Sequence, residues 1–219
     1  MSDGQRSNQE ANGYYVPRWL SWAREIQAIA QTGYHYASDE YHRQRYSRLL
    51  EIAAEITSEY SDLDYPHIVL SYQQQTGYAT PRIDVRGAVF QADRLLMVRE
   101  RVDGGWTLPG GWADVGEFPS KAAEREVWEE AGYKVKARKV IGVYDANRMG
   151  QLELFHAYKI VFLCDLISGE AKPSVETSEV AFFDKNVLPE VLSGERTKLR
   201  HIQDAFRCLD QPDLPTVFD

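Results

Sequence analysis

The stretch GWADVGEFPSKAAEREVWEEAGY, residues 111–133, decides the fold of this chain. Pro119 suits the first turn of a helix because its missing N–H has no partner there, and Gly132 suits the left-handed position just past a helix end. We therefore predict a helix from about Pro119 to Ala131. Glutamates at positions 126, 129 and 130 are three and four residues apart, so their carboxylates project from one face of this helix.

This acidic face predicts a site for a divalent cation. Like charges at such spacing repel one another, and hard oxygen ligands of this kind are those that Mg2+ and Mn2+ select. The preceding loop, residues 104–116, contains five glycines and Pro109, which lets its backbone approach a ligand closely. An isolated E-x-x-E-E would instead indicate the solvated face of a surface helix, but here about nine positions stand at fixed offsets.

The spacing of the whole stretch resembles the Nudix box, G-x5-E-x7-R-E-U-x-E-E-x-G-U, in which U is an apolar residue. The resemblance implies an α/β/α sandwich with a mixed sheet and Mg2+ or Mn2+ as cofactor. It implies that the metal ligands are the carbonyl of Gly110 and the carboxylates of Glu126, Glu129 and Glu130. It also gives Arg125 and Glu117 the task of holding the loop against the helix, with Glu117 reaching metal through water. Phe118 departs from the family pattern, which often has a capping serine there.

The general base is left open by the sequence. A box glutamate serves in some Nudix enzymes, and in others a carboxylate from a loop after the box, where Glu176 and Glu179 are suitably placed or form only a solvated strand entry. The candidate catalytic residues are thus Glu117, Arg125, Glu129, Glu130, Glu176 and Glu179.

Candidate substrate contacts lie before the box and within it. Arg82, Asp84 and Arg86 alternate along one strand, so they share a face that lines the cleft or merely forms ion pairs. Lys159 is a weaker candidate for a place near phosphate. Three aromatic residues could stack on a base or anchor the core: Trp106, Trp112 and Tyr144.

Composition limits the class of partner and the compartment. The formal net charge of −8 argues against an extended nucleic-acid surface or a surface for anionic membranes. The sequence shows no signal-peptide pattern and no apolar run of membrane-spanning length. Cys164 and Cys208 have no metal-ligand spacing and are interpreted as buried free thiols. We therefore expect a cytoplasmic protein.

The remaining chain is expected to form a flexible leader (1–16), an N-terminal helical domain (17–65), a linker (66–80) and a Nudix domain (81–219). A first helix should start at Arg18 and stop near Gly33, and a second, capped by Ser38 or Asp39, should end near Tyr60. The linker is expected to hold one short strand at residues 67–72. Later strands are expected at 83–90, 95–100, 134–144, 153–164 and 179–183, with a last helix at 196–209.

The segment QAIAQTGYHYASDEYHRQRYSRLLEIAAEI, residues 27–56, sharpens the resemblance. It is similar to the N-terminal domain of a subgroup of bacterial Nudix hydrolases that act on X-linked nucleoside diphosphates and tend to form homodimers. The resemblance implies metal-dependent cleavage of such a diphosphate, with CDP-choline ahead of ADP-ribose. The alternatives are an enzyme that removes modified nucleoside triphosphates and a Nudix-fold sensor without hydrolysis. A homodimer is expected through the apolar stripe of Trp19, Trp22, Ile26, Leu49 and Ile56.

Overall fold

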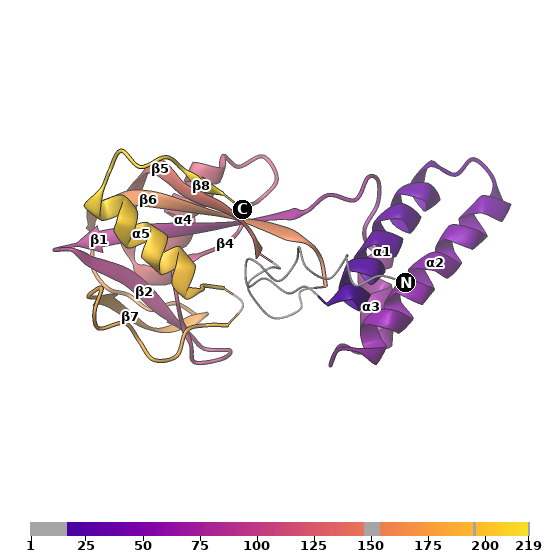
Figure 1. Ribbon diagram of the computed structural model, residues 1–219, viewed down its shortest axis with the longest axis horizontal. Coiled ribbons are helices and arrows are strands. Elements are labelled where there is room, and N and C mark those ends of the chain that lie inside the picture. The colour runs from indigo at the N-terminus through magenta and orange to yellow at the C-terminus, as the bar shows by residue number, and fades with distance from the viewer. Residues whose placement is uncertain (1–16, 147–153, 195, 219) are drawn as a thin grey trace, which may run out of the picture. The chain divides into compact units, whose positions relative to one another are not determined.

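The computed structural model describes residues 17–146, 154–194 and 196–218, which fall into two compact units (Figure 1). Of these residues, one unit takes in 17–81 together with 154–156, and the other takes in the rest. The predicted leader at residues 1–16 lies outside the described residues. The boundary therefore falls between Pro81 and Arg82, and a short piece of the chain between two later strands belongs to the first unit.

The first unit contains three helices among its described residues, α1 (Arg18–Tyr36), α2 (Glu40–Glu59) and α3 (Tyr65–Gln73). The two predicted helices correspond to α1 and α2, although α1 continues past Gly33 to Tyr36. Of the two predicted cap residues, Ser38 and Asp39, it is Asp39 that caps α2, because its side chain accepts the backbone N–H of His42 at 2.9 Å. Helix α2 ends at Glu59, beside the predicted end at Tyr60.

The strand predicted at residues 67–72 is wrong, because this segment lies within helix α3. Pro66 stands in the first turn of α3, where a missing N–H has no cost. Ile68 and Tyr72, four residues apart, are buried with Ala53 and Ala54 of α2. The expected linker is thus largely a packed part of the first unit.

Among its described residues, the second unit is a mixed sheet with two helices. Its helices are α4 (Pro119–Ala131) and α5 (Leu199–Asp210). Its strands are β1 (Arg82–Gln91), β2 (Arg94–Glu100), β3 (Trp106–Thr107), β4 (Gly110–Trp112), β5 (Tyr133–Asp145), β6 (Ala157–Gly169), β7 (Thr177–Phe183) and β8 (Val217–Phe218). The strand order is β3-β2-β1-β6-β5-β8, with β4 on β1 and β7 on β2. The β1–β6 and β5–β8 pairs are parallel, and the others are antiparallel.

Strand β6 differs from the expected range of 153–164. It begins at Ala157 and continues to Gly169, because β5 pairs with it as far as Tyr133 opposite Gly169. A turn joins β1 to β2, with positive φ angles at Ala92 and Asp93. Such angles at both central residues suit a tight hairpin.

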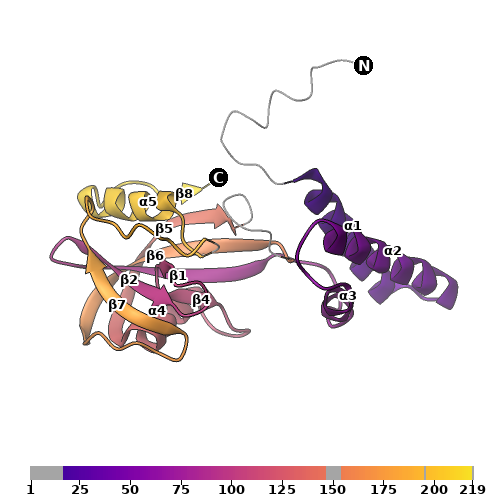
Figure 2. The ribbon, with the colours of Figure 1, turned by 90° about the horizontal axis from the view of Figure 1, so that it is seen from below.

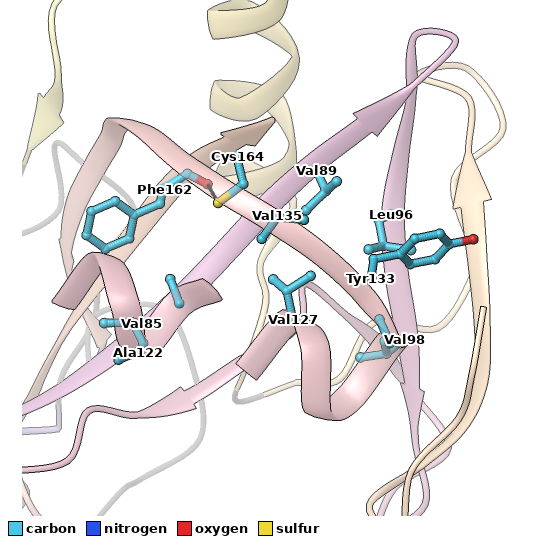
Figure 3. Packing of buried hydrophobic residues seen from close by; sticks show 12 residues of the cluster. Val85, Val89, Leu96, Val98, Ala122, Val127, Tyr133, Val135, Phe162 and Cys164 are labelled. Atoms are coloured by element: carbon cyan, nitrogen blue, oxygen red, sulfur yellow. Dashed lines mark hydrogen bonds between the residues drawn. The ribbon is translucent and has the colours of Figure 1, made fainter. Parts of the chain in front are cut away.

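Helices α4 and α5 cover opposite faces of the sheet (Figure 2). Val85 and Val89 of β1 pack with Val127 of α4, whereas Ala88 packs with Ile202 of α5. Figure 3 shows the cluster on the α4 side, where apolar side chains from the sheet and the helix meet. Alternate residues of β1 therefore face different helices, as a pleated strand requires. The predicted α/β/α sandwich with a mixed sheet is confirmed.

Helix α4 has the predicted bounds. Gly132 ends it with φ 77° and donates its N–H to the carbonyl of Trp128 at 3.0 Å. Phe118 stands at the N-cap without a side-chain hydrogen bond, as its apolar ring requires. The box helix is thus fixed more by its packed face and its glycine end than by its start. Among the described residues, no helix is both long and apolar enough to cross a membrane.

A buried histidine gives the sandwich a testable acid response. His201 of α5 accepts the backbone N–H of Lys198 through Nδ1 at 3.2 Å, and burial, with Lys159 nearby, lowers the pKa of His201 to about 3. In the unfolded chain, the imidazole of His201 takes up a proton near the ordinary histidine pKa of 6.5. The free energy of unfolding therefore decreases as the pH falls from 6.5 toward 3, because the unfolded state binds the proton first. We expect His201→Gln, which keeps an acceptor, to remove about 3 kcal/mol of this loss at pH 4. Urea unfolding of both proteins from pH 7 to pH 4 measures it, and parallel pH curves would contradict it.

Candidate active site

The turn that enters the box is pressed against strand β1. Register pairs Asp84 with Trp112 and Arg86 with Gly110. Gly110 has φ 148°, and a Cβ there would stand 2.0 Å from the carbonyl oxygen of Val85. Only glycine fits this position, so the missing side chain at Gly110 is what lets β4 lie on β1.

Glu130 is the buried carboxylate of the box. Its Oε2 accepts the backbone N–H of Gly110 at 2.9 Å, which ties the end of α4 to the start of β4. The pKa of Glu130 is raised to about 7, chiefly by burial and also by the charges of Glu100 and Glu126, while Arg86 and the Gly110 amide oppose this rise. This carboxyl group is therefore desolvated and surrounded by other negative charge.

Glu126 lies one turn earlier and is half-buried. Its carboxylate lies against Gly111, where a Cβ would come within 3.0 Å of Oε1. Burial raises the pKa of Glu126, and the charge of Glu129 raises it further, while Arg125 lowers it. Because Gly110 and Gly111 have no side chains, the carboxylates of Glu126 and Glu130 can lie directly against the backbone of these two residues.

Arg125 connects the loop to the helix face. Its Nε and Nη2 donate to the two carboxylate oxygens of Glu117 at 3.1 and 3.0 Å. Its Nη1 donates to Glu126 at 2.8 Å and to the exposed Glu129 at 3.0 Å. The contact between Arg125 and Glu117 that the resemblance implies is present, and it lowers the pKa of Glu117. Arg125 therefore stiffens the acidic face rather than pointing toward a substrate.

The donor set fits a divalent cation. Within the described ranges, no three Asp, Glu, His or Cys side chains already converge as a metal-binding group. The contacts of Arg125 occupy one oxygen each of Glu126 and Glu129, so each carboxylate has a second oxygen for a cation. Desolvated carboxylates that repel one another are stabilised when a hard cation binds between them. Ligation by the Gly110 carbonyl and by Glu129 stays a prediction.

The two later glutamates are placed differently. Glu179 is exposed on β7 and forms an ion pair with Arg99 at 2.7 Å. Glu176 is also exposed, but it precedes Thr177, whose hydroxyl donates to the backbone carbonyl of Glu130 at 2.8 Å. Glu176 therefore lies beside the end of the box helix and is the better placed of the two for a base, which stays a prediction.

The substrate candidates on β1 separate into buried and exposed residues. Asp84 and Arg86 are 6% and 3% exposed and bind each other, which is the ion-pair alternative. Lys159, a weak phosphate candidate, is equally buried and lies 3.1 Å from Asp84. Arg82 is exposed, with its guanidinium 5.9 Å from the ring of the exposed Trp112. Only this last pair is open to a substrate.

Two further aromatic candidates are core anchors. The ring of Trp106 packs edge-on against Phe183. Tyr144 is fully buried, and its hydroxyl donates to Asp204 at 3.0 Å. Tyr144 therefore offers no open face to a base, and Trp106 is half-buried against the core.

Glu100 is a charged neighbour of the site that sequence reasoning missed. It ends β2, is 3% exposed and lies 3.2 Å from Arg196. Burial raises its pKa, while Arg196 and Arg86 lower it. The one signal in the sequence is its position, at the junction of an apolar strand and the glycine-rich loop.

Comparison with known proteins agrees with this geometry. A family model described as the NUDIX domain matches residues 80–205, and one described as a UDP-X-like, N-terminal oligomerisation domain matches residues 17–69. A putative ADP-ribose pyrophosphatase of Bacillus subtilis is 37% identical over 203 residues, which cover 92% of this chain and 97% of that protein. The chain belongs to the Nudix family. It is a Nudix pyrophosphohydrolase.

Two other proteins extend the comparison. The ADP-ribose pyrophosphatase of Methanocaldococcus jannaschii is 33% identical over 120 residues, which cover 52% of this chain and 68% of that protein. A crystal structure of a UDP-X diphosphatase aligns with a TM-score of 0.59 and 30% identity, covering 92% of this chain and 98% of that one. The similarity to that structure thus includes both units of the chain.

Proposed function

We propose that the protein hydrolyses the diphosphate of a nucleoside diphosphate linked to a second group X, giving a nucleoside monophosphate and phosphorylated X. The observation that carries this proposal is the pair of desolvated carboxylates, Glu126 and Glu130, set against Gly110 and Gly111. The relatives named for ADP-ribose and for UDP-X both act on diphosphates of this class by their names.

The residues of the site would share the work as follows. Mg2+ or Mn2+, when bound, would neutralise phosphate charge and activate water for attack. Glu126 and Glu130 would hold the cation, with Glu129 and the Gly110 carbonyl completing the set. Either a box glutamate or Glu176 would take the proton from water. The exposed Trp112 and Arg82 would contact the base or the phosphates of the substrate.

The substrate class is tested by a panel of nucleotides assayed with Mg2+, with Mn2+ and with EDTA. UDP-sugars, ADP-ribose and CDP-choline should release the monophosphate, and EDTA should abolish the reaction. Hydrolysis in 18O-labelled water identifies which phosphorus is attacked. Activity on triphosphates alone would instead assign the protein to removal of modified nucleotides, and tight nucleotide binding without hydrolysis would make it a sensor. The cytoplasmic location of the protein also stays a prediction.

We further propose a homodimer that forms through α1. Trp22 and Ile29 are seven residues apart on one face of this helix and are 51% and 57% exposed. The double substitution Trp22→Glu and Ile29→Glu should convert the dimer to a monomer, because two buried charges would each cost several kcal/mol. Light scattering on the purified proteins measures the change. Val187→Glu, at an exposed position in the second unit, is the matched control, and a double variant that remains dimeric would exclude this face.

A further inference from the structure

Arg86 lies at the centre of a buried polar network beneath the turn Leu108–Gly110, which leads into the Nudix box. Its Nε and Nη2 donate to the two carboxylate oxygens of Asp84 at 2.9 and 2.8 Å, and its Nη1 donates to the carbonyl of Leu108 at 3.1 Å. All three guanidinium nitrogens of Arg86 thus donate hydrogen bonds to other groups of the protein. We propose that Arg86 is a positioning residue, which fixes the Leu108–Gly110 backbone and through it the Glu130 carboxylate. This inference rests on the proposed hydrolysis.

Three successive residues of the turn are held in this way. The Leu108 carbonyl accepts from Arg86, the Pro109 carbonyl accepts the N–H of Gly87 at 2.9 Å, and the Gly110 N–H donates to Glu130. Gly110 also lies against the stem of Arg86, since a Cβ there would be 2.8 Å from its Cδ. The Arg86 side chain therefore braces the backbone on which Glu130 is anchored, together with the hydroxyls of Thr107 and Thr197 at Leu108.

Asp84 and Lys159 hold the guanidinium in place. Asp84 binds both nitrogens on one side of Arg86 and lies 3.1 Å from the amine of Lys159, so its single charge is shared by two buried cations. The planar fork of arginine can bind Asp84 in bidentate fashion and still direct Nη1 to Leu108. Lysine carries its three donors on one nitrogen, so it cannot bind Asp84 through two parallel bonds and reach Leu108 with a third nitrogen. The site therefore requires arginine at position 86 rather than any cation.

The competing role is direct binding of substrate phosphate, and the geometry argues against it. Arg86 is 3% exposed, and the face of β1 that carries it also carries Ala88, which packs with α5. Arg82, four residues earlier in β1, is the exposed arginine of the same strand. A phosphate ligand and a positioning residue have different kinetic signatures, because the first contributes mainly to KM and the second mainly to kcat.

The first experiment is kinetic. Arg86→Lys should lower kcat by about 10- to 100-fold, since small misplacements of catalytic groups have effects of this size, and should leave KM within about twofold. Arg138→Lys, in the exposed ion pair with Asp165, is the matched control and should leave both constants unchanged. A rise in KM at constant kcat would overturn the positioning role in favour of phosphate binding.

The second experiment needs no turnover, so it separates a failure of this inference from a failure of the proposed function. Amide hydrogen exchange followed by NMR should show the Gly110 N–H of the native protein protected about 100-fold more than the exposed loop amide of Gly116. Arg86→Lys should reduce that protection about tenfold. If this variant does not fold, Asp84→Asn, which leaves the arginine but weakens its orientation, should reduce it in the same direction. Equal exchange at Gly110 and Gly116 in the native protein, or unchanged Gly110 exchange in the folded variants, would overturn the inference.

Discussion

Glu130→Gln is expected to abolish hydrolysis and at the same time to stabilise the fold at pH 8. The loss of activity should be about 10³-fold or more, because the substitution removes the charge of the buried carboxylate among those proposed to hold the cation. The amide keeps the shape of the side chain and an oxygen to accept the Gly110 N–H. Initial rates with Mg2+ on the best substrate of the panel measure the loss.

The gain in stability follows from the raised pKa of Glu130. Its carboxyl group has a pKa of about 7 in the folded chain against an ordinary glutamate value of 4.5, so the folded state binds more protons between these values. The contribution of Glu130 to the free energy of unfolding is therefore fully present below pH 4.5 and is lost as the pH rises through 7. Glutamine does not titrate, so the variant should be more stable than the native protein at pH 8 by at most about 3 kcal/mol.

Thermal unfolding in EDTA at pH 4.5 and pH 8 tests this second part. The difference between the two proteins should be small at the lower pH and large at the higher one. Asp165→Asn, at an exposed ion pair, is the control and should show no gain at either pH. A folded Glu130→Gln protein with native activity would remove Glu130 from the site, and a destabilised one at pH 8 would contradict the proposed desolvation.

Gly110→Ala is expected to destabilise the second unit by about 3 to 5 kcal/mol and to abolish activity. The added Cβ would stand 2.0 Å from the Val85 carbonyl oxygen and 2.8 Å from the Cα of Arg86. Both neighbours are backbone of a central strand and cannot move without breaking the pairing of β4 with β1. The φ of 148° adds conformational strain. Overpacking and strain of this kind each cost about 1 to 3 kcal/mol.

Gly116→Ala separates strain from collision. Gly116 has φ 88°, but a Cβ there would meet nothing within 4 Å. The control should therefore lose only about 1 kcal/mol, the usual cost of a left-handed angle for a residue other than glycine. Urea unfolding compares the two variants, and equal losses would show that the β1–β4 contact at Gly110 is looser than its geometry indicates.

Local signals in the sequence were enough for the box and for the general architecture. Pro119 and Gly132 mark the helix ends because each suits one position in a helix terminus. Asp39 caps α2 for the same kind of local reason. Alternation along β1 was enough to place Asp84 and Arg86 on one face.

Features that depend on distant partners could not be read in the same way. The apolar run in α3 is too short to distinguish a strand from a helix, and the packing of Ile68 and Tyr72 on α2 decides it. The burial of Glu100 depends on Arg196, almost a hundred positions later, which no local pattern reveals. The sequence also left open whether Asp84 and Arg86 line a cleft, because that depends on α5 covering their side of the sheet.

The short piece of chain just before β6 limits how this protein can be recombined. Leu154 and Phe155 pack with the buried cluster of the first unit, although they lie in the connection between β5 and β6. A chimera that replaced only residues 17–81 with the segment of another family member would leave these two side chains facing a foreign partner. A graft that keeps this packing must therefore carry the helical unit and the segment around Leu154 and Phe155 together.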